Sequence, residues 1–211
     1  MLLRDIVERY HIGNVTVLRY FIKCLMNNLT KPTSINAIYN DLRSQGRKSS
    51  RDELYKWCDY LCDCYMFFRV PKYTHSLIGE QQSLRKYYFI DNGMRQSVLL
   101  PQSGDDGKLL ENSVFLHLMR KKGAFDKISY YLSGKECDFV VQQHDQVVQL
   151  IQVCWSMDND STRQREIEGL MYASEATNCD NLLIITHDEE YEMLMNGKNV
   201  RVIPAYKWML E

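Results

Sequence analysis

The sequence predicts a mixed α/β protein made of two small domains, residues 1–91 and residues 92–211. A chain of 211 residues with 45% hydrophobic and 25% charged residues is long enough for two such domains and ordinary for a globular protein. The first part holds 14 Lys and Arg against 9 Asp and Glu, a formal +5, and the second holds 12 against 18, a formal −6. The expected order of helices and strands also changes at the boundary, so we expect two domains with different tasks.

The first part has strong local signals for helix boundaries. Ser34 is placed to cap a short amphipathic helix that ends at Gly46, a residue type suited to the position after a helix. Ser50 and Glu53 have the spacing of a capping box. The expected elements are helices at 15–29, 35–46 and 52–66, and extended segments at 66–73 and 85–91 joined by a polar loop at 74–84. Three helices followed by a β-hairpin are typical of a winged helix-turn-helix.

The second part predicts a different order of elements. Gly134 and the turn His144-Asp145 separate three successive strand candidates, and Asp160 or Ser161 is expected to cap a later helix. The expected elements are a turn at 104–107, a helix at 108–123, strands at 127–133, 135–143 and 146–155, a helix at 161–177, and strands at 180–188 and 199–206. This α-β-β-β-α-β order is typical of the restriction-endonuclease-like core, which has a mixed sheet.

Several classes of function have no support in the sequence. No apolar run is long enough to span a bilayer, and the N-terminus lacks the layout of a signal peptide. The seven cysteines show no framework spacing, which favours reduced thiols in a cytoplasmic protein. Cys58, Cys62 and Cys64 are close in sequence, but they lack the paired ligand sets of a zinc site. Neither a P-loop nor a dinucleotide-binding glycine motif is present, so we expect no nucleotide cofactor.

One set of residues has the spacing of a metal-dependent nuclease motif. In the nuclease core, a helix Glu, an Asp on the second strand and a Glu/Gln-x-Lys on the third strand converge on Mg²⁺ or Mn²⁺. This chain offers Glu111, Asp138 and the run Gln152-Val153-Cys154 at those places. Strand alternation puts Gln152 and Cys154 on one face of the sheet. Glu111, Asp138 and Gln152 are therefore the candidate metal ligands.

The final residue of that motif departs from the pattern. Cys154 stands where a lysine is expected, and the neutral Gln152 leaves two carboxylates, so we expect weak metal binding and a degenerate catalytic site. A basic residue from elsewhere, Lys108 or Arg163, is a possible substitute, whereas Lys135 points to the opposite face from Asp138. The same acids also have ordinary structural explanations, as a residue near a helix start or as the partner of an arginine.

A basic cluster in the first part is the candidate nucleic-acid contact. Its members surround the second turn and the third helix: Arg43, Arg47, Lys48, Arg51 and Lys56. In a helix-turn-helix, residues at similar positions contact DNA phosphates. The same helix also carries four acids (Asp52, Glu53, Asp59 and Asp63), so DNA contact and a purely structural or protein-docking winged helix are equal alternatives.

Several segments resemble a large family of prokaryotic AAA-superfamily ATPases. DIVERYHIGN, PTSINAIYNDLRSQGRKSSRDELYKWCDYL, FFRVPKYTHSL and KYYFIDNGM resemble the region just after the ATPase core, and LLENSVFLHLMRK, GKECDFVV, LIQVCW and NLLIITHD resemble the C-terminal domain, which is related to the PD-(D/E)xK nucleases. The resemblance covers nearly the whole chain. It implies that the P-loop ATPase domain, which would precede these segments, is absent here.

The sequence therefore favours the C-terminal part of an AAA-type ATPase that recruits DNA or a partner and does not itself hydrolyse ATP. An active nuclease with a relocated basic residue and a regulatory protein-interaction module without nucleic-acid binding are the alternatives. The expected partners are DNA and the missing ATPase domain, with no membrane contact. The sequence gives no oligomeric state.

Overall fold

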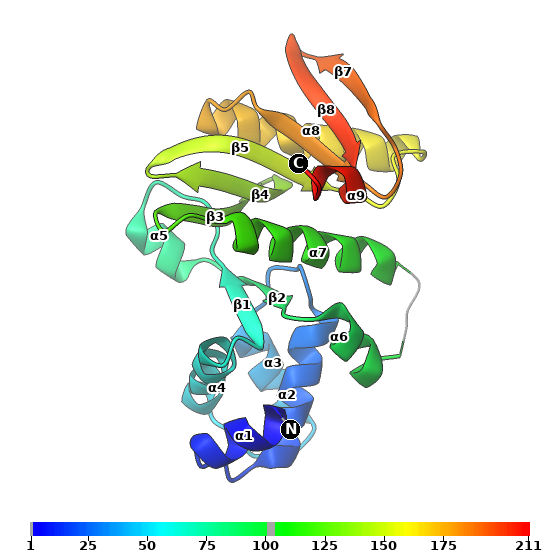
Figure 1. The fold of residues 1–211 in the computed structure, drawn as a ribbon. Coiled ribbons are helices and arrows are strands. Elements are labelled where there is room, and N and C mark those ends of the chain that lie inside the picture. Colours follow the sequence, from blue (N-terminus) through cyan, green and yellow to red (C-terminus); the bar gives the residue numbers. More distant parts are fainter. Residues whose placement is uncertain (1, 101–103) are drawn as a thin grey trace. The chain divides into compact units, whose positions relative to one another are not determined.

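The computed structural model describes residues 2–100 and 104–211 and has a mixed α/β fold (Figure 1). It divides into two compact units: Met1–Arg69 with Leu84–Pro101, and Val70–Ser83 with Gln102–Glu211. The sequence-based boundary after residue 91 differs from this division in both directions. Arg95 of the following helix donates from Nε to the carbonyl oxygen of Met26, which joins that helix to the first unit. In the described part of the chain, no helix has the length and apolar character needed to cross a bilayer.

The first unit is helical with a two-stranded sheet. Its elements are α1 (Leu2–Arg9), α2 (Val15–Asn27), α3 (Ile35–Ser44), α4 (Arg51–Asp63), β1 (Phe67–Val70), β2 (Lys86–Phe89) and α6 (Asn92–Val98), and β1 pairs with β2. The predicted caps are confirmed: Ser34 accepts from the Ala37 N–H, and Ser50 and Glu53 form a reciprocal capping box. Residues from α1, α2, α3 and α4 pack with Phe67 and Phe89 in one apolar core.

The second unit is built on a six-stranded mixed sheet. Its elements are α5 (Leu77–Gln82), α7 (Asp105–Lys121), β3 (Asp126–Ser133), β4 (Lys135–Gln143), β5 (Gln146–Val153), α8 (Asp160–Thr177), β6 (Leu182–Thr186), β7 (Tyr191–Met195), β8 (Lys198–Pro204) and α9 (Ala205–Trp208). The strand order is β3-β4-β5-β6-β8-β7. The β5–β6 and β6–β8 pairs are parallel, and the other pairs are antiparallel.

Two long helices cover opposite faces of this sheet (Figure 1). Phe115 of α7 stacks on Phe139 of β4 with ring centroids 6.3 Å apart. The next residue of β4, Val140, faces the other way and shares an apolar cluster with Leu170 of α8. Gly169 brings α8 against β4, because a Cβ at this position would lie 2.0 Å from the carbonyl oxygen of Glu136. The short turns at Gly134 and His144, both with positive φ, fix the β3-β4-β5 meander.

The structure corrects several sequence-based boundaries. The expected loop at 74–84 contains α5, the expected turn at 104–107 is the start of α7, and the cap of α8 is Asn159 rather than Asp160 or Ser161. The helices α1, α6 and α9 and the strand β7 were not predicted, and α9 replaces the end of the strand expected at 199–206. Residues 70–83 belong to the second unit because the Tyr73 N–H donates to the Tyr130 carbonyl of β3 at 2.6 Å.

Candidate functional site

Asp138 and Gln152 lie opposite each other on two neighbouring strands. The antiparallel register that pairs Phe139 with Ile151 sets this arrangement. The Asp138 N–H donates to Oε1 of Gln152 at 3.1 Å, and the Val153 N–H donates to Oδ2 of Asp138 at 3.0 Å. Both side chains are buried, with relative exposures of 6% and 4%. Two of the motif residues therefore form one buried hydrogen-bonded pair.

Glu166, which no sequence pattern indicates, completes this cluster from α8. Gln152 donates from Nε2 to Oε2 of Glu166, and Arg165 donates from Nε to Oε1 of Glu166 at 3.1 Å. Burial raises the pKa of Glu166, and the nearby Asp138 adds to this rise, while the hydrogen bond from Arg165 opposes it. Together, Asp138, Gln152, Glu166 and Arg165 form what we call the β4–β5–α8 cluster.

The orientation of the Gln152 amide decides what the cluster can hold. A backbone N–H can only donate, so the contact with Asp138 N–H requires the Gln152 oxygen on that side and the NH₂ group toward Glu166. The amide oxygen, which would be the metal ligand, is thus already bonded to the backbone. The NH₂ group that faces Glu166 carries partial positive charge and repels a cation.

Cys154 provides no charge at the position of the missing lysine. Its thiol is buried and donates to the carbonyl oxygen of Ser156 at 2.9 Å. Burial, helped by the charge of Glu166, raises the pKa of Cys154 to about 11. The side chain is therefore a neutral thiol near pH 7, neither a thiolate ligand nor a strong nucleophile.

Glu111, the remaining candidate of the nuclease motif, lies on α7 and not on α8. It is buried on α7, one helical turn before Phe115, and α7 covers the face of the sheet opposite to α8. Within residues 2–100 and 104–211, no group of three or more His, Cys, Asp or Glu side chains is arranged to hold a metal ion.

The basic residues considered as substitutes have acidic neighbours. Lys108 Nζ lies 3.1 Å from Asp105, Arg163 Nη1 lies 3.6 Å from Asp160, and Lys135 pairs with Glu168 at 2.5 Å. Arg165, by contrast, belongs to the β4–β5–α8 cluster through its ion pair with Glu166, although its side chain is 69% exposed. Its position 13 residues after Gln152 carries no signal in the sequence, because only the packing of α8 on the sheet brings it there.

The predicted nucleic-acid residues lie on the surface of the first unit. Two of the arginines are held on aromatic rings: the Arg47 guanidinium is 4.5 Å from the Tyr20 ring centroid, and that of Arg51 is 5.3 Å from Tyr39. Arg43, Lys48 and Lys56 are exposed.

The acids of α4 divide into two groups. Glu53 is used in the capping box, and Asp59 pairs with Arg69 at 2.8 Å. Asp52 and Asp63 are exposed, and helical spacing puts both on the side of Lys56. The exposed face of α4 thus carries both signs of charge.

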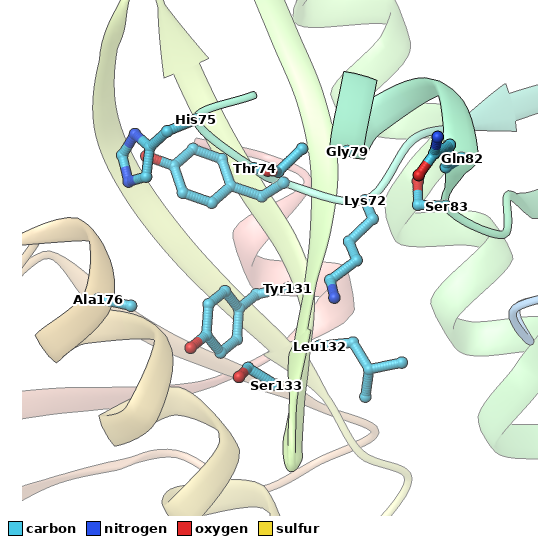
Figure 2. A pocket seen from close by; sticks show the side chains of 11 residues that line it. Lys72, Thr74, His75, Gly79, Gln82, Ser83, Tyr131, Leu132, Ser133 and Ala176 are labelled. Carbon is cyan, nitrogen blue, oxygen red and sulfur yellow. The ribbon is translucent and has the colours of Figure 1, made fainter. Parts of the chain in front are cut away.

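A separate hollow of about 500 Å³ lies in the second unit, beside α5 and β3 (Figure 2). Figure 2 shows the Lys72 side chain directed toward Tyr131 and Leu132 of β3. His75 contributes a ring that meets Tyr73 edge-on, at 5.3 Å between centroids. No carboxylate is among the residues that line this hollow, so its polar groups suit a neutral or anionic ligand. None of the predicted site residues lies in it.

Comparisons with known proteins connect the chain to proteins without a described activity. Residues 1–105 match the family model described as a domain of unknown function (DUF8612). The chain is 32% identical to the uncharacterized protein MJ1544 of Methanocaldococcus jannaschii, over 98% of this chain and 47% of that protein. It is 24% identical to an uncharacterized protein of Haemophilus influenzae, over 100% of this chain and 50% of that protein. The chain thus spans about half the length of the curated relatives it matches.

Proposed function

We propose that this chain is a DNA-recruiting module whose second unit has a nuclease-type fold without nuclease activity. The observation that carries the proposal is the Gln152 amide, which gives its oxygen to the Asp138 N–H and its NH₂ to Glu166. Asp138, Gln152 and Glu166 are linked to one another by hydrogen bonds through Gln152. Within the described residues, no group of three or more His, Cys, Asp or Glu side chains is arranged to hold Mg²⁺, which requires near-octahedral coordination. With a neutral thiol at Cys154, the cluster supports the fold and does not activate water.

The finer features of the fold belong to the same proposal. The succession α2, α3, α4 and the β1–β2 pair supports a winged helix-turn-helix in the first unit. The succession α7, β3, β4, β5, α8 and β6, with a β5–β6 parallel pair, supports a restriction-endonuclease-like core in the second. In this proposal, the chain corresponds to the C-terminal part of an AAA-type ATPase. The relatives' length, about twice the matched region, is compatible with a further domain in those proteins.

The cleavage part of the proposal is tested with labelled single- and double-stranded DNA and RNA in Mg²⁺ and Mn²⁺. We expect no cleavage by the wild-type chain, and calorimetry should detect no specific metal binding. Restoring the motif with Gln152→Glu and Cys154→Lys should increase Mn²⁺ affinity, because a third carboxylate is added. Metal-dependent cleavage by the wild type that is lost in Asp138→Ala would overturn the proposal.

A single observation favours the active nuclease as a second candidate. Arg165 contacts Glu166 and lies close enough to Asp138 for their charges to interact. It is the basic group at the cluster that could replace the lysine. If the wild type cleaves DNA, Arg165→Ala should abolish cleavage, whereas the matched change Arg163→Ala two residues earlier should not.

The recruiting part of the proposal is tested through the salt dependence of DNA binding. If Arg47 and Lys48 contact phosphates, Arg47→Ala/Lys48→Ala should weaken binding and lower the slope of log K against log salt by about 1.8 for duplex DNA. Binding without salt dependence, or no binding, would favour the alternative module that contacts only proteins. The exposed acids Asp52 and Asp63 of α4 are the observation in favour of that alternative.

A further inference from the structure

A cluster of exposed cations lies where α7 ends and β3 begins. Arg120, Lys121 and Lys122 are exposed, and the described part of the chain places no carboxylate within 4.0 Å of any of them. Lys127, at the start of β3, lies 3.9 Å from Asp145, whose side chain is 98% exposed. This short segment therefore presents four positive charges to solvent in a unit that is acidic overall.

An aromatic ring lies among these cations. Phe125 is 73% exposed, so most of its apolar ring is in contact with water. Its ring stacks on His144, with centroids 5.8 Å apart and planes at 18°. His144 holds one side of the ring and the other remains open. We refer to Arg120, Lys121, Lys122, Phe125, Lys127 and His144 as the α7–β3 patch.

A hollow of about 350 Å³ adjoins this patch on the α7 face of the sheet. Lys121 and Lys122 line it, and Leu118, Ile128, Val141 and Trp208 provide apolar surface. Two carboxylates also line it. Asp126 accepts from the Gly123 N–H at 2.8 Å, and Glu211 is bonded to Arg201 and lies close enough to Lys121 for that charge to help lower the pKa of Glu211. The hollow thus combines apolar and aromatic surface with two lysine ammonium groups, and the four cations of the patch outnumber the two carboxylates at the hollow.

Helix electrostatics explains only part of this arrangement. Arg120 and Lys121 lie in the last turn of α7, where positive charge is favourable. That reason does not extend to Lys127 or to the exposed ring of Phe125. A positive surface with an open aromatic face and an apolar hollow fits a ligand that has both phosphates and flat, unstacked rings.

We propose that the α7–β3 patch binds single-stranded nucleic acid, with the cations on its phosphates and Phe125 and the adjoining hollow in contact with its bases. This inference rests on the proposed recruiting function and adds a second contact surface, in the other unit from Arg47 and Lys48. A duplex keeps its bases stacked, so the open ring of Phe125 specifically favours a single strand.

Fluorescence anisotropy with a labelled 15-nucleotide oligo(dT) and a duplex of the same length tests this surface. Phe125→Ala should weaken single-strand binding about 5- to 150-fold, the usual effect of losing one stacked base, and change duplex binding much less. The control Tyr206→Ala removes another exposed ring of the same unit and should have no effect. Both rings are exposed, so thermal unfolding should show that both variants fold.

The lysines are tested by the double variant Lys121→Gln/Lys122→Gln. It should lower the salt slope of single-strand binding by about 1.4, because each lost phosphate contact on a single strand contributes about 0.7. Lys23→Gln/Lys31→Gln changes the net charge equally at exposed positions of the first unit and should leave the slope unchanged. Equal changes of the salt slope in the two double variants would overturn the proposal. It would also be overturned if polyglutamate bound as tightly as oligo(dT) and Phe125→Ala left polyglutamate binding unchanged.

The outcomes also separate this inference from the recruiting function itself. Single-strand binding that is lost only in Arg47→Ala/Lys48→Ala would refute the patch and leave the proposed function intact. Absence of binding to both oligonucleotides would refute both.

Discussion

Because α8 approaches β4 closely at Gly169, Gly169→Ala is the most direct test of how α8 packs on the sheet of the second unit. The added Cβ would lie 2.0 Å from the carbonyl oxygen of Glu136 and 3.1 Å from its carbonyl carbon. Both are backbone atoms held in a strand, so no flexible side chain can move aside. Either α8 or β4 must shift by about 1 Å to restore an ordinary van der Waals distance.

The size of the effect follows from two opposing contributions. Overpacking a tight interface costs about 1–3 kcal/mol and more when backbone must move, whereas Gly→Ala within a helix contributes about 1 kcal/mol in favour of folding. Because the contact is with backbone, we expect a net loss of about 2 kcal/mol. For a protein of this size, this corresponds to a fall in Tm of about 4–8 °C.

Gly107→Ala is the matched control for this substitution. Gly107 also lies within a long helix, α7, but a Cβ there meets no atom within 4 Å. We therefore expect Gly107→Ala to raise stability by about 0.5–1 kcal/mol. Urea unfolding followed by circular dichroism measures both variants. If Gly169→Ala is as stable as Gly107→Ala, the inferred contact between α8 and β4 does not exist.

Three further predictions concern individual side chains. Ser50→Ala removes the capping box of α4 and should lower the free energy of unfolding by about 1 kcal/mol in urea titrations; an unchanged midpoint would show that the cap is dispensable. Burial raises the pKa of Glu166, so its contribution to stability is full at low pH and falls as the pH rises through that pKa. The free energy of unfolding, measured between pH 4 and 8, should therefore fall less in Glu166→Gln than in the wild type, and identical profiles would contradict the burial of this charge. Because burial raises the pKa of Cys154 to about 11 from 9.0, its alkylation at pH 8, followed by peptide mass spectrometry, should be about 100-fold slower in the folded chain than in urea; equal rates would mean that the thiol is accessible and unperturbed.

The candidate site shows where sequence-based prediction ends. The pairing of β4 with β5 could be predicted from the two-residue turn between them, but that turn alone would place Asp138 opposite Ile151. The register shift between Val141 and Gln142 brings Asp138 opposite Gln152, with which it is in contact. Glu166 and Arg165 could not be found in this way, because a polar residue in a helix with a weak apolar stripe has no periodic signal. Their roles arise only when α8 crosses the sheet at Gly169.

The same limit applies to the basic residues. Spacing alone favoured Lys108 and Arg163 as substitutes for the missing lysine, but it does not reveal that each has an acid within one turn of its own helix. Likewise, in the sequence Phe125 is only a single apolar residue in a polar turn. Its exposure and its stacking on His144, 19 residues later, depend on the β3–β4 pairing.

The sequence by itself determined the mixed α/β class, the caps at Ser34 and Ser50, and the β3-β4-β5 meander, because these depend on hydrogen bonds and turns within a few residues. Only the tertiary structure decided that residues 70–83 join the second unit, that β8 lies between β6 and β7, and that Gln152 turns its oxygen away from Glu166. Those features depend on contacts between segments far apart in the chain. Such contacts are set by the hydrogen bonding of buried polar groups and by close packing of the backbone, and no local sequence pattern specifies which segments meet.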